Sequence, residues 1–319
     1  MINRSTIGVV AVTYNATRTI RGFLTSLVEQ TYWDFILYLT DNASADQTLE
    51  EIAKYKEPRI RVFRNQENLG WAEGANRGIQ AALADGCPMV LLMNDDTEFG
   101  PHLLEKLVRG LDEHSCEMIV PKIFFFDNQR MIWSAGGTFR RWRGYAPSHH
   151  GVFQIDGGQY DVPRQVEHGP ACCLLLRREV FDRIGILDNR FFLCLDDADL
   201  CYRAMRAGFK LFYVPSATLL HKASSSTGGA SSDLNARYGT RSHVIYMLKH
   251  LGIWRGMFFL PAYQVYLVMN LLTGKLKPSR FVLREKAFFE GLRVWKQTVA
   301  GRARQTQAIS TLTLPGKLT

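Results

Sequence analysis

Short apolar runs alternate with stretches of helical spacing through the first hundred residues of this chain. The runs and the helical stretches cover residues 7–12, 17–30, 35–39, 44–55, 60–63, 72–84 and 89–93 in turn. Apolar runs of this length, bounded by polar residues, predict buried strands. Strands that alternate with helices form right-handed βαβ units and a mostly parallel sheet. The sequence therefore predicts an α/β fold with a Rossmann-like, mixed and mostly parallel sheet.

The pattern becomes less regular after residue 98. We expect further helices and strands at 103–111, 117–120, 171–176, 178–184, 199–207 and 211–214. Pro215 is expected to end the last of these strands. Residues 124–168 are rich in glycine, aromatic and charged residues, which is typical of an irregular insertion that carries recognition.

Polar residues follow three of the predicted strands at their carboxyl ends. They are Thr13, Tyr14 and Asn15 after the first strand, Asp41 and Asn42 after the second, and Asn94, Asp95 and Asp96 after the fourth. Open α/β folds bind ligands at this edge of the sheet. Adjacent carboxylates are costly to hold there unless a cation or a ligand donor pairs with them. Oxygen ligands on a short loop suit Mg²⁺ or Mn²⁺ bound to a diphosphate, and a solvated turn that caps the next helix is the alternative.

Two further features add to this edge. A carboxylate such as Asp41 can accept hydrogen bonds from an imide N–H or from ribose hydroxyls, which suits a uridine or thymidine nucleotide. A glycine-bearing loop that contains Asn68 and Gly70 leads into a helix with Asn76, although ordinary helix punctuation also explains it. No Gly-x-Gly-x-x-Gly follows the first strand, so a dinucleotide site is not predicted.

A second acidic cluster follows an aromatic run and contains Asp196, Asp197 and Asp199. Asp199 and Arg203 have the spacing of a structural helix pair, which leaves Asp196 and Asp197 to face a cleft. A carboxylate there can accept a proton from an attacking hydroxyl as a general base. His221 follows the next strand, where it either contacts a metal or phosphate or has a structural role.

Together these segments resemble the family 2 inverting glycosyltransferases of the GT-A fold, in particular the rhamnosyltransferase-like group. The likeness covers about residues 5–250. It rests on the order and spacing of 10–15, Asp41-Asn42-x-Ser44-x-Asp46, Asn68-x-Gly70, Asn94-Asp95-Asp96-Thr97, Asp196-Asp197-x-Asp199-Leu200-x-x-Arg203 and His221. Two positions depart from the family pattern. Asn94 replaces the first acid of an Asp-x-Asp motif, and Asp196-Asp197 replaces Glu-Asp.

The resemblance implies roles for these residues. Asp41 is expected to read the nucleotide base, Asp96 to belong to the metal–diphosphate motif, and Asp197 to be the catalytic base. We expect His221 to assist the metal, which is Mg²⁺ or Mn²⁺, and Asp196 to lie beside the base. The remaining expected donor-binding residues are Thr13, Tyr14, Asn15, Asn42, Asn68, Gly70, Asn76, Asn94 and Asp95. The expected acceptor-binding residues are Trp133, Gly136, Gly137 and Asp199.

The C-terminal region carries most of the positive charge. Residues 236–319 hold 14 Lys+Arg and 2 Asp+Glu, a net charge of +12, whereas residues 1–235 hold 25 and 28, a net charge of −3. So basic a region indicates an anionic partner, such as a membrane surface, a lipid phosphate or nucleic acid. Residues 256–274 carry no charge but contain Pro261 and interfacial tyrosines. They favour a helix or helical hairpin in the membrane surface over a true span, with a core helix as the alternative.

These features predict a GT-A catalytic domain over 1–235, with a nucleotide-binding half over about 1–98 and an acceptor half over about 99–235. Residues 236–319 are predicted to be a helical, basic, membrane-associating region. The first residues hold no apolar signal-peptide core, and the six cysteines show no Cys-x-x-Cys pair. We therefore expect a cytoplasmic enzyme on the inner face of the cell membrane.

The expected donor is dTDP-rhamnose or a UDP-sugar. The expected acceptor is a glycan or a polyprenyl-diphosphate-linked sugar of cell-surface polysaccharide synthesis. Nucleic acid is not an expected partner, because the aromatic residues of the tail lie in apolar runs and not among Lys and Arg. The alternatives are a UDP-hexose transferase of the same fold, a nucleotidyltransferase and a basic nucleic-acid-binding protein.

Overall fold

The computed structural model describes residues 6–223 and 232–312, without the side chains at 253, 255, 257 and 298–312. Two compact units divide the chain, Met1–Ser232 and Asp233–Thr319. Residues 1–5 and 224–231 of the predicted catalytic domain, and 313–319 of the predicted tail, lie outside the described residues.

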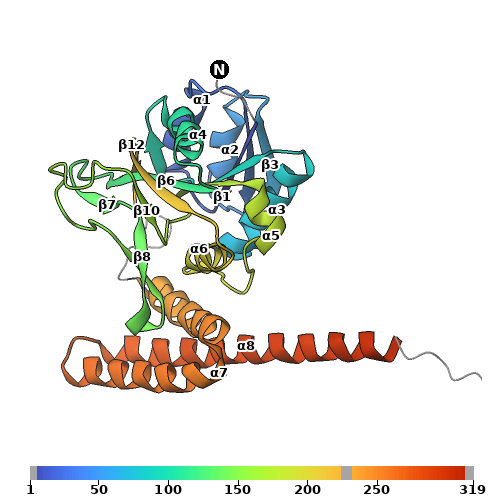
Figure 1. Cartoon of the computed structure of the whole chain (residues 1–319), viewed down its shortest axis with the longest axis vertical. Helices are drawn as coiled ribbons and strands as arrows, with labels where there is room; N and C mark the ends of the chain where they lie inside the picture. Colours follow the sequence, from blue (N-terminus) through green and yellow to red (C-terminus); the bar gives the residue numbers. More distant parts are fainter. Residues whose placement is uncertain (1–5, 224–231, 313–319) are drawn as a thin grey trace, which may run out of the picture. The chain divides into compact units, whose positions relative to one another are not determined.

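A mixed sheet forms the centre of the first unit (Figure 1). Its strands are β1 (Ile7–Thr13), β2 (Phe35–Asp41), β3 (Ile60–Arg64), β4 (Met89–Asn94), β5 (Thr97–Phe99), β6 (Met118–Phe125), β7 (Ile132–Ser134), β10 (Arg164–Val166), β11 (Cys173–Arg177) and β12 (Leu211–His221). The main order is β10-β12-β6-β11-β4-β1-β2-β3, with β5 paired to β12 and β7 to β6. Strands β3, β2, β1 and β4 are parallel, and β11 runs antiparallel between β4 and β6. The predicted α/β fold with a mixed sheet is confirmed.

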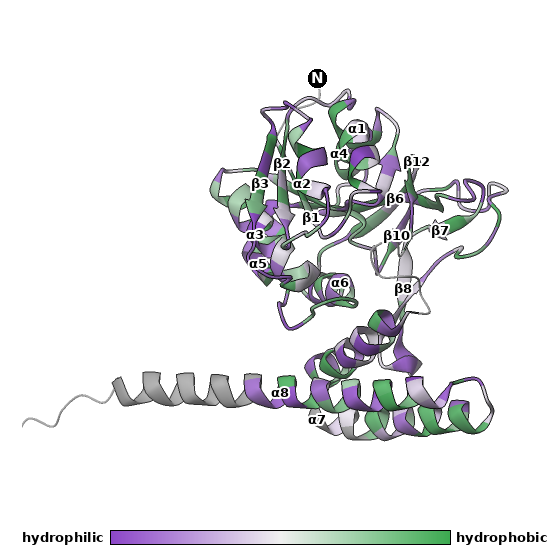
Figure 2. Ribbon diagram, turned by 180° about the vertical axis from the view of Figure 1, so that it is seen from behind, coloured by the Kyte–Doolittle hydropathy of each residue, from purple (hydrophilic) through white to green (hydrophobic). Residues whose placement is uncertain are grey.

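Helices cover both faces of this sheet. They are α1 (Ile20–Val28), α2 (Thr48–Ala53), α3 (Gly70–Ala84), α4 (Leu103–Glu113), α5 (Arg178–Ile184) and α6 (Asp196–Arg206). Figure 2 shows the central strands coloured mainly as hydrophobic, as expected for a sheet buried on both faces.

Strand β1 shows how alternate residues serve the two faces. Ile7, Val9 and Ala11 belong to the core cluster that includes α1 and α4. The other face packs on α3 through glycine. A Cβ at Gly74 would lie 2.9 Å from Val12 Cγ1, and one at Gly78 would lie 2.8 Å from Val10 Cγ1. The glycines of α3 therefore allow the helix to approach the strand closely.

Two expectations about the acceptor half are wrong. Residues 124–168 are not irregular throughout, because they hold β7, β10 and a hairpin of β8 (Gly137–Arg140) and β9 (Ala146–His149). Their short strands lack the length and alternation that make strands visible in sequence. Strand β12 also does not end at Pro215. Its register shifts between Val214 and Thr218, so Pro215 lies in a bulge and the strand continues to His221.

The second unit is helical, as predicted, and consists of α7 (Asp233–Leu272) and α8 (Pro278–Leu312). Gly252 has a φ of 73° and interrupts the helical geometry of α7. Val244, Leu248 and Phe288 form a small core between the two helices. Among the described residues, no helix combines the length and the apolar character that crossing a membrane requires.

Candidate active site at the carboxyl edge of the sheet

The register of the parallel strands brings the predicted donor-binding segments together. Thr13 pairs with Asp41 between β1 and β2, and Val12 pairs with Asn94 between β1 and β4. The Asp41 carboxylate is buried and accepts the backbone N–H of Ser44 at 3.3 Å. The ends of β1, β2 and β4 thus form one continuous polar edge.

Asp197 reaches the same edge through its contact with the segment before β11. This strand runs antiparallel to β4, so the segment before it lies beside the end of β4. There the Ala171 backbone N–H donates to Asp197 Oδ2 over 3.3 Å. Burial raises the pKa of the Cys172 thiol, and the charges of Asp96 and Asp197 contribute to that shift. Both carboxylates therefore lie near one side chain, as the sequence predicts for acids far apart in the chain.

Asp96 and His221 form a buried pair at the end of β4. His221 Nε2 lies 3.1 Å from Asp96 Oδ1, because the β5–β12 pairing places His221 opposite Thr97. Burial, and then the charge of Asp96, raise the pKa of Asp95 to about 7, while the Thr13 hydroxyl opposes the shift. Asp95 Oδ2 is buried without a hydrogen-bond partner among the described residues. A cation bound at this edge would therefore stabilise the ionised carboxylates of Asp95 and Asp96.

A divalent metal fits this donor set. The Asp96 carboxylate and the His221 imidazole offer oxygen and nitrogen ligands, and the carboxylates suit Mg²⁺ or Mn²⁺. Within 6–223 and 232–312, no group of three or more His, Cys, Asp or Glu side chains is arranged to hold a metal. A metal here would thus need ligands from a bound diphosphate or water in addition to those of the protein.

Asp196 and Asp197 open α6 after a strained turn, so the expectation that this helix begins at Asp199 is wrong. Cys194 and Leu195 have φ values of 68° and 64°, which non-glycine residues seldom adopt. Such strain is found preferentially where function requires a particular geometry. The turn places the two adjacent carboxylates in the first turn of α6.

The two acids differ in ionisation. Burial, followed by repulsion from Asp197, holds the pKa of Asp196 well above its usual range. Burial also disfavours the charge on Asp197, but His168 and His149 outweigh it and lower the pKa of that carboxyl. The surroundings therefore favour the protonated form of Asp196 and the charged form of Asp197. Environments that push the pKa values of two neighbouring carboxyl groups apart are typical of catalytic acid–base pairs. The role of Asp197 as the base stays a prediction.

A row of aromatic and histidine side chains, here called the wall, extends from Asp197 to the Asp96–His221 pair. His168 Nε2 lies 3.8 Å from Asp197 Oδ2, and the His149 ring lies 5.2 Å from the His168 ring. Trp133 continues the wall, at 4.9 Å from the His149 ring and 4.6 Å from the His221 ring. His168 is not predicted from the sequence, and neither is the site position of His149, because a histidine in a segment without periodicity gives no sign of its neighbours.

Gly136 and Gly137 allow the backbone to pass close to this wall. Gly136 has a φ of 74°, which favours glycine. A Cβ on Gly137 would lie 2.4 Å from the Ser148 carbonyl oxygen and 3.2 Å from His168 Nδ1. Gly137 thus lies next to His168, and Trp133 next to His149. The role of Trp133, Gly136 and Gly137 in acceptor binding stays a prediction.

The donor loop is joined to the acidic loop through Gly70. Gly70 N–H donates to Asn68 Oδ1 at 2.9 Å, and Asn42 Nδ2 donates to the Gly70 carbonyl at 2.9 Å. A Cβ on Gly70, whose φ is 82°, would lie 2.4 Å from the Phe192 carbonyl oxygen. The Trp71 N–H donates to the same oxygen over 2.8 Å. Asn42, Asn68 and Gly70 therefore fix the loop geometry of the site.

Tyr14 and Asn15 follow β1 at the rim. Tyr14 is exposed, and Asn15 has a φ of 50°. Asn15 Oδ1 accepts the Ala45 N–H at 2.8 Å, which ties the ends of β1 and β2 together. A cavity of about 620 Å³ opens next to Asn15 and is lined by Thr17, Asp46 and their neighbours.

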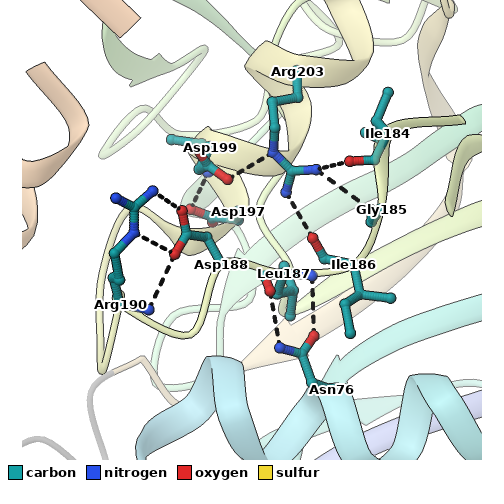
Figure 3. Close-up of polar contacts among 11 residues, drawn as sticks. Asn76, Ile184, Gly185, Ile186, Leu187, Asp188, Arg190, Asp197, Asp199 and Arg203 are labelled. Atoms are coloured by element: carbon teal, nitrogen blue, oxygen red, sulfur yellow. Dashed lines mark hydrogen bonds and ion pairs between the residues drawn. The ribbon is translucent and has the colours of Figure 1, made fainter. Parts of the chain in front are cut away.

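Asn76, and Asp199 through Arg203, contact residues 184–187 (Figure 3). Asn76 Oδ1 accepts the Leu187 N–H at 3.0 Å, and its Nδ2 donates to the Leu187 carbonyl at 2.9 Å. The buried Asp199 accepts from Arg203 Nε at 2.8 Å, and Arg203 donates to the carbonyls of Ile184 and Ile186. Both residues thus brace the loop that leads to the acids, and their roles in donor and acceptor binding stay predictions.

Replacing Asn76 by alanine is expected to lower the free energy of unfolding by about 1–3 kcal/mol, because it leaves buried backbone groups of Leu187 without partners. Chemical denaturation measures the change. Gln80→Ala, one turn later on the exposed face of α3, is the matched control. Equal stability of the two variants would contradict the bracing role.

Replacing His168 by asparagine is expected to move the acid limb of the pH–kcat profile to higher pH. His168 lowers the pKa of Asp197, so its removal raises that pKa, and the base then loses its proton only at higher pH. His150→Asn is the control, since His150 also lies in the insertion but does not contribute to the Asp197 shift. An unchanged acid limb in the His168 variant would contradict the assignment.

Comparison with known proteins supports the same interpretation. The sequence model of the family described as glycosyl transferase family 2 matches residues 8–185. An N-acetylglucosaminyl-diphospho-decaprenol L-rhamnosyltransferase of Mycobacterium tuberculosis is 28% identical over 264 residues, which cover 77% of this chain and 86% of the relative. The dTDP-rhamnosyl transferase RfbF of Shigella flexneri is 22% identical over 218 residues, which cover 68% of this chain and 69% of the relative.

A solved structure shows the same fold. The mannosyltransferase PcManGT from Pyrobaculum calidifontis, in complex with GDP-Man and Mn²⁺, superposes with a TM-score of 0.56 at 14% identity. The superposition covers 90% of this chain and 87% of that chain. This similarity shows that the fold is of the predicted GT-A type.

Proposed function

The chain belongs to glycosyl transferase family 2 and is a glycosyltransferase, and on this basis we propose that it transfers rhamnose from a nucleoside-diphosphate donor with inversion at the anomeric carbon. The observation that carries the proposal is the convergence of three acids on one edge of the sheet. Asp41 ends β2 and Asp96 follows β4, the two parallel strands on either side of β1, and Asp197 is hydrogen-bonded to the segment before β11. A donor that lies across this edge can reach all three.

The donor roles follow from this placement. The nucleoside lies over the ends of β1 and β2, where Asp41 accepts from the base and Thr13, Tyr14 and Asn15 line the rim. The diphosphate lies at the end of β4, next to Asn94 and Asp95. Asp96 and His221 would hold a divalent metal, which when bound neutralises charge on the leaving diphosphate. Asn94 carries no charge, so this chain contributes one acid fewer to the metal than the family motif.

Asp197 performs the proton transfer. It accepts the proton of the acceptor hydroxyl while the hydroxyl oxygen forms a bond to the anomeric carbon, and the bond from that carbon to the diphosphate oxygen breaks. The neighbouring His168 lowers the pKa of the Asp197 carboxyl and so favours its charged form. A single displacement inverts the configuration.

The sugar and the acceptor are proposed from the relatives. Both rhamnosyltransferases named above support rhamnose as the transferred sugar, and RfbF supports a dTDP-linked donor. The mycobacterial relative supports an acceptor linked to a polyprenyl diphosphate. Such a substrate lies at the cytoplasmic face of a membrane, where the basic C-terminal unit, with a net charge of +12 over 236–319, can bind anionic lipid.

A donor screen tests this function. The protein is incubated with dTDP-rhamnose, UDP-glucose and UDP-galactose in the presence of Mn²⁺ or Mg²⁺, with a lipid-linked N-acetylglucosamine acceptor. Acceptor-dependent release of dTDP is the expected result. Release of UDP alone would identify the chain as a hexosyltransferase of the same fold, and no release from any donor would contradict the proposal.

A further inference from the structure

The β8–β9 hairpin carries a basic aromatic tip that the sugar-transfer mechanism does not use. The tip consists of Arg140, Arg141, Trp142 and Arg143. Trp142 is 75% exposed, and all three arginines are exposed. The Arg143 guanidinium lies 5.5 Å from the centre of the Trp142 ring. Four adjacent exposed side chains of this kind form one continuous patch.

The charge of this tip is uncompensated. None of the ion pairs found in 6–223 and 232–312 involves Arg140, Arg141 or Arg143. Other arginines of the same unit pair with acids, as Arg59 does with Glu57 and Arg203 with Asp199. No acidic residue occurs between Asp127 and Asp156 in the sequence. The tip therefore presents three guanidinium groups that a phosphate-bearing partner can bind.

Next to its tip, the hairpin packs on α6, the helix that carries Asp197. Phe139 and Tyr145 pack on Tyr202 of α6, with ring centres 5.4 and 5.2 Å apart, respectively. The Phe139 N–H donates to Glu167 at 2.8 Å. The four residues of each strand extend roughly 13 Å from His149 at the site to the tip. Because Asp197 lies in the first turn of α6, these contacts fix the distance between the tip and Asp197.

We propose that the hairpin tip binds the surface of an anionic phospholipid membrane and sets the height of the active site above it. Trp142 enters the interfacial region, which tryptophan favours, and the arginines bind lipid phosphates through two parallel hydrogen bonds. Membrane binding by the tip does not depend on the proposed function. Only its purpose does, which is to keep Asp197 at the height of the hydroxyl of a lipid-linked acceptor. A single tryptophan offers no row of stacking platforms, so single-stranded nucleic acid fits the tip less well.

Fluorescence of the intact chain tests the position of Trp142. The protein is titrated with vesicles of phosphatidylcholine, with and without phosphatidylglycerol, and the emission of the Trp142→Phe variant is subtracted. We expect the Trp142 emission to shift to the blue and to be quenched by brominated lipids only when phosphatidylglycerol is present. Emission of Trp142 that stays unchanged while the protein binds the vesicles would overturn the proposal.

The arginines are tested by cosedimentation with the same vesicles. The triple change Arg140→Gln, Arg141→Gln and Arg143→Gln is expected to weaken binding by up to about 100-fold at low salt. A matched control removes the same charge at three exposed arginines of other elements, Arg21→Gln, Arg109→Gln and Arg130→Gln. Equal weakening by both sets would show an effect of net charge alone and overturn the proposal.

Two further observations complete the test. Displacement of the tip from vesicles by RNA at equimolar phosphate would favour nucleic acid and also overturn it. Because binding is measured without donor or acceptor, a failure of sugar transfer leaves this result intact. Conversely, loss of vesicle binding in the tip variants, with normal release of dTDP from the donor when the acceptor is water-soluble, would support the anchor separately from the chemistry.

Discussion

Replacement of Asp197 by asparagine lowers kcat by about 10²–10⁴-fold in our account, the range typical of a lost general base. The amide keeps the shape of the side chain but cannot accept the proton of the acceptor hydroxyl. Donor binding should change little, because the donor contacts come from the ends of β1, β2 and β4. Initial rates at saturating donor and acceptor, together with calorimetric binding of dTDP, separate these two effects.

Two variants control this experiment. Asp196→Asn should cost far less activity than Asp197→Asn, because burial and repulsion from Asp197 raise the pKa of Asp196 and so favour the protonated form, which the amide resembles. Asp182→Asn, at an exposed position on α5, should have no effect. A greater loss in the Asp196 variant than in the Asp197 variant would exchange the roles of the two acids.

Replacement of Asp96 by asparagine is expected to lower kcat/KM for the donor by about 10²-fold or more, since stabilising charge on a leaving diphosphate contributes several kcal/mol. The variant should also require more Mn²⁺ for half-maximal rate. The metal dependence of dTDP release measures both quantities.

The control for Asp96 is Glu98, a nearby acid in β5. Glu98 forms an ion pair with Lys222, and it lies two residues from Asp96 in the sequence. Glu98→Gln should therefore leave the Mn²⁺ dependence unchanged. An Asp96→Asn enzyme with the Mn²⁺ dependence of the parent would contradict the metal role of the Asp96–His221 pair.

The first half of the fold is predictable from sequence because each of its elements carries a local signal. Strands β1, β2 and β4 are apolar runs with polar ends, and the carboxyl ends of parallel strands meet at one edge whatever the loops do. This is why Asp41 and Asp96 can be placed together without coordinates. Asp197 follows because an acidic pair at the start of a helix is seldom needed for capping alone.

The acceptor half is less predictable because its contacts are not local. The bulge at Pro215 carries β12 on to His221, and nothing in the sequence distinguishes this from a strand end. His168 reaches Asp197 only after the 124–168 segment has folded into short strands. Asn76 and Asp199 satisfy the motif spacing, yet packing against the 184–190 loop gives them a bracing role. Spacing identifies such residues, but only their partners reveal what they do.

The anomeric configuration of the product tests the central claim most directly. Proton NMR of the glycoside formed from dTDP-β-L-rhamnose reports the configuration at the transferred carbon. One displacement assisted by Asp197 predicts an α-linked product. A β-linked product would require a second displacement and a nucleophile, and it would contradict the assignment of Asp197 as the base of an inverting transferase.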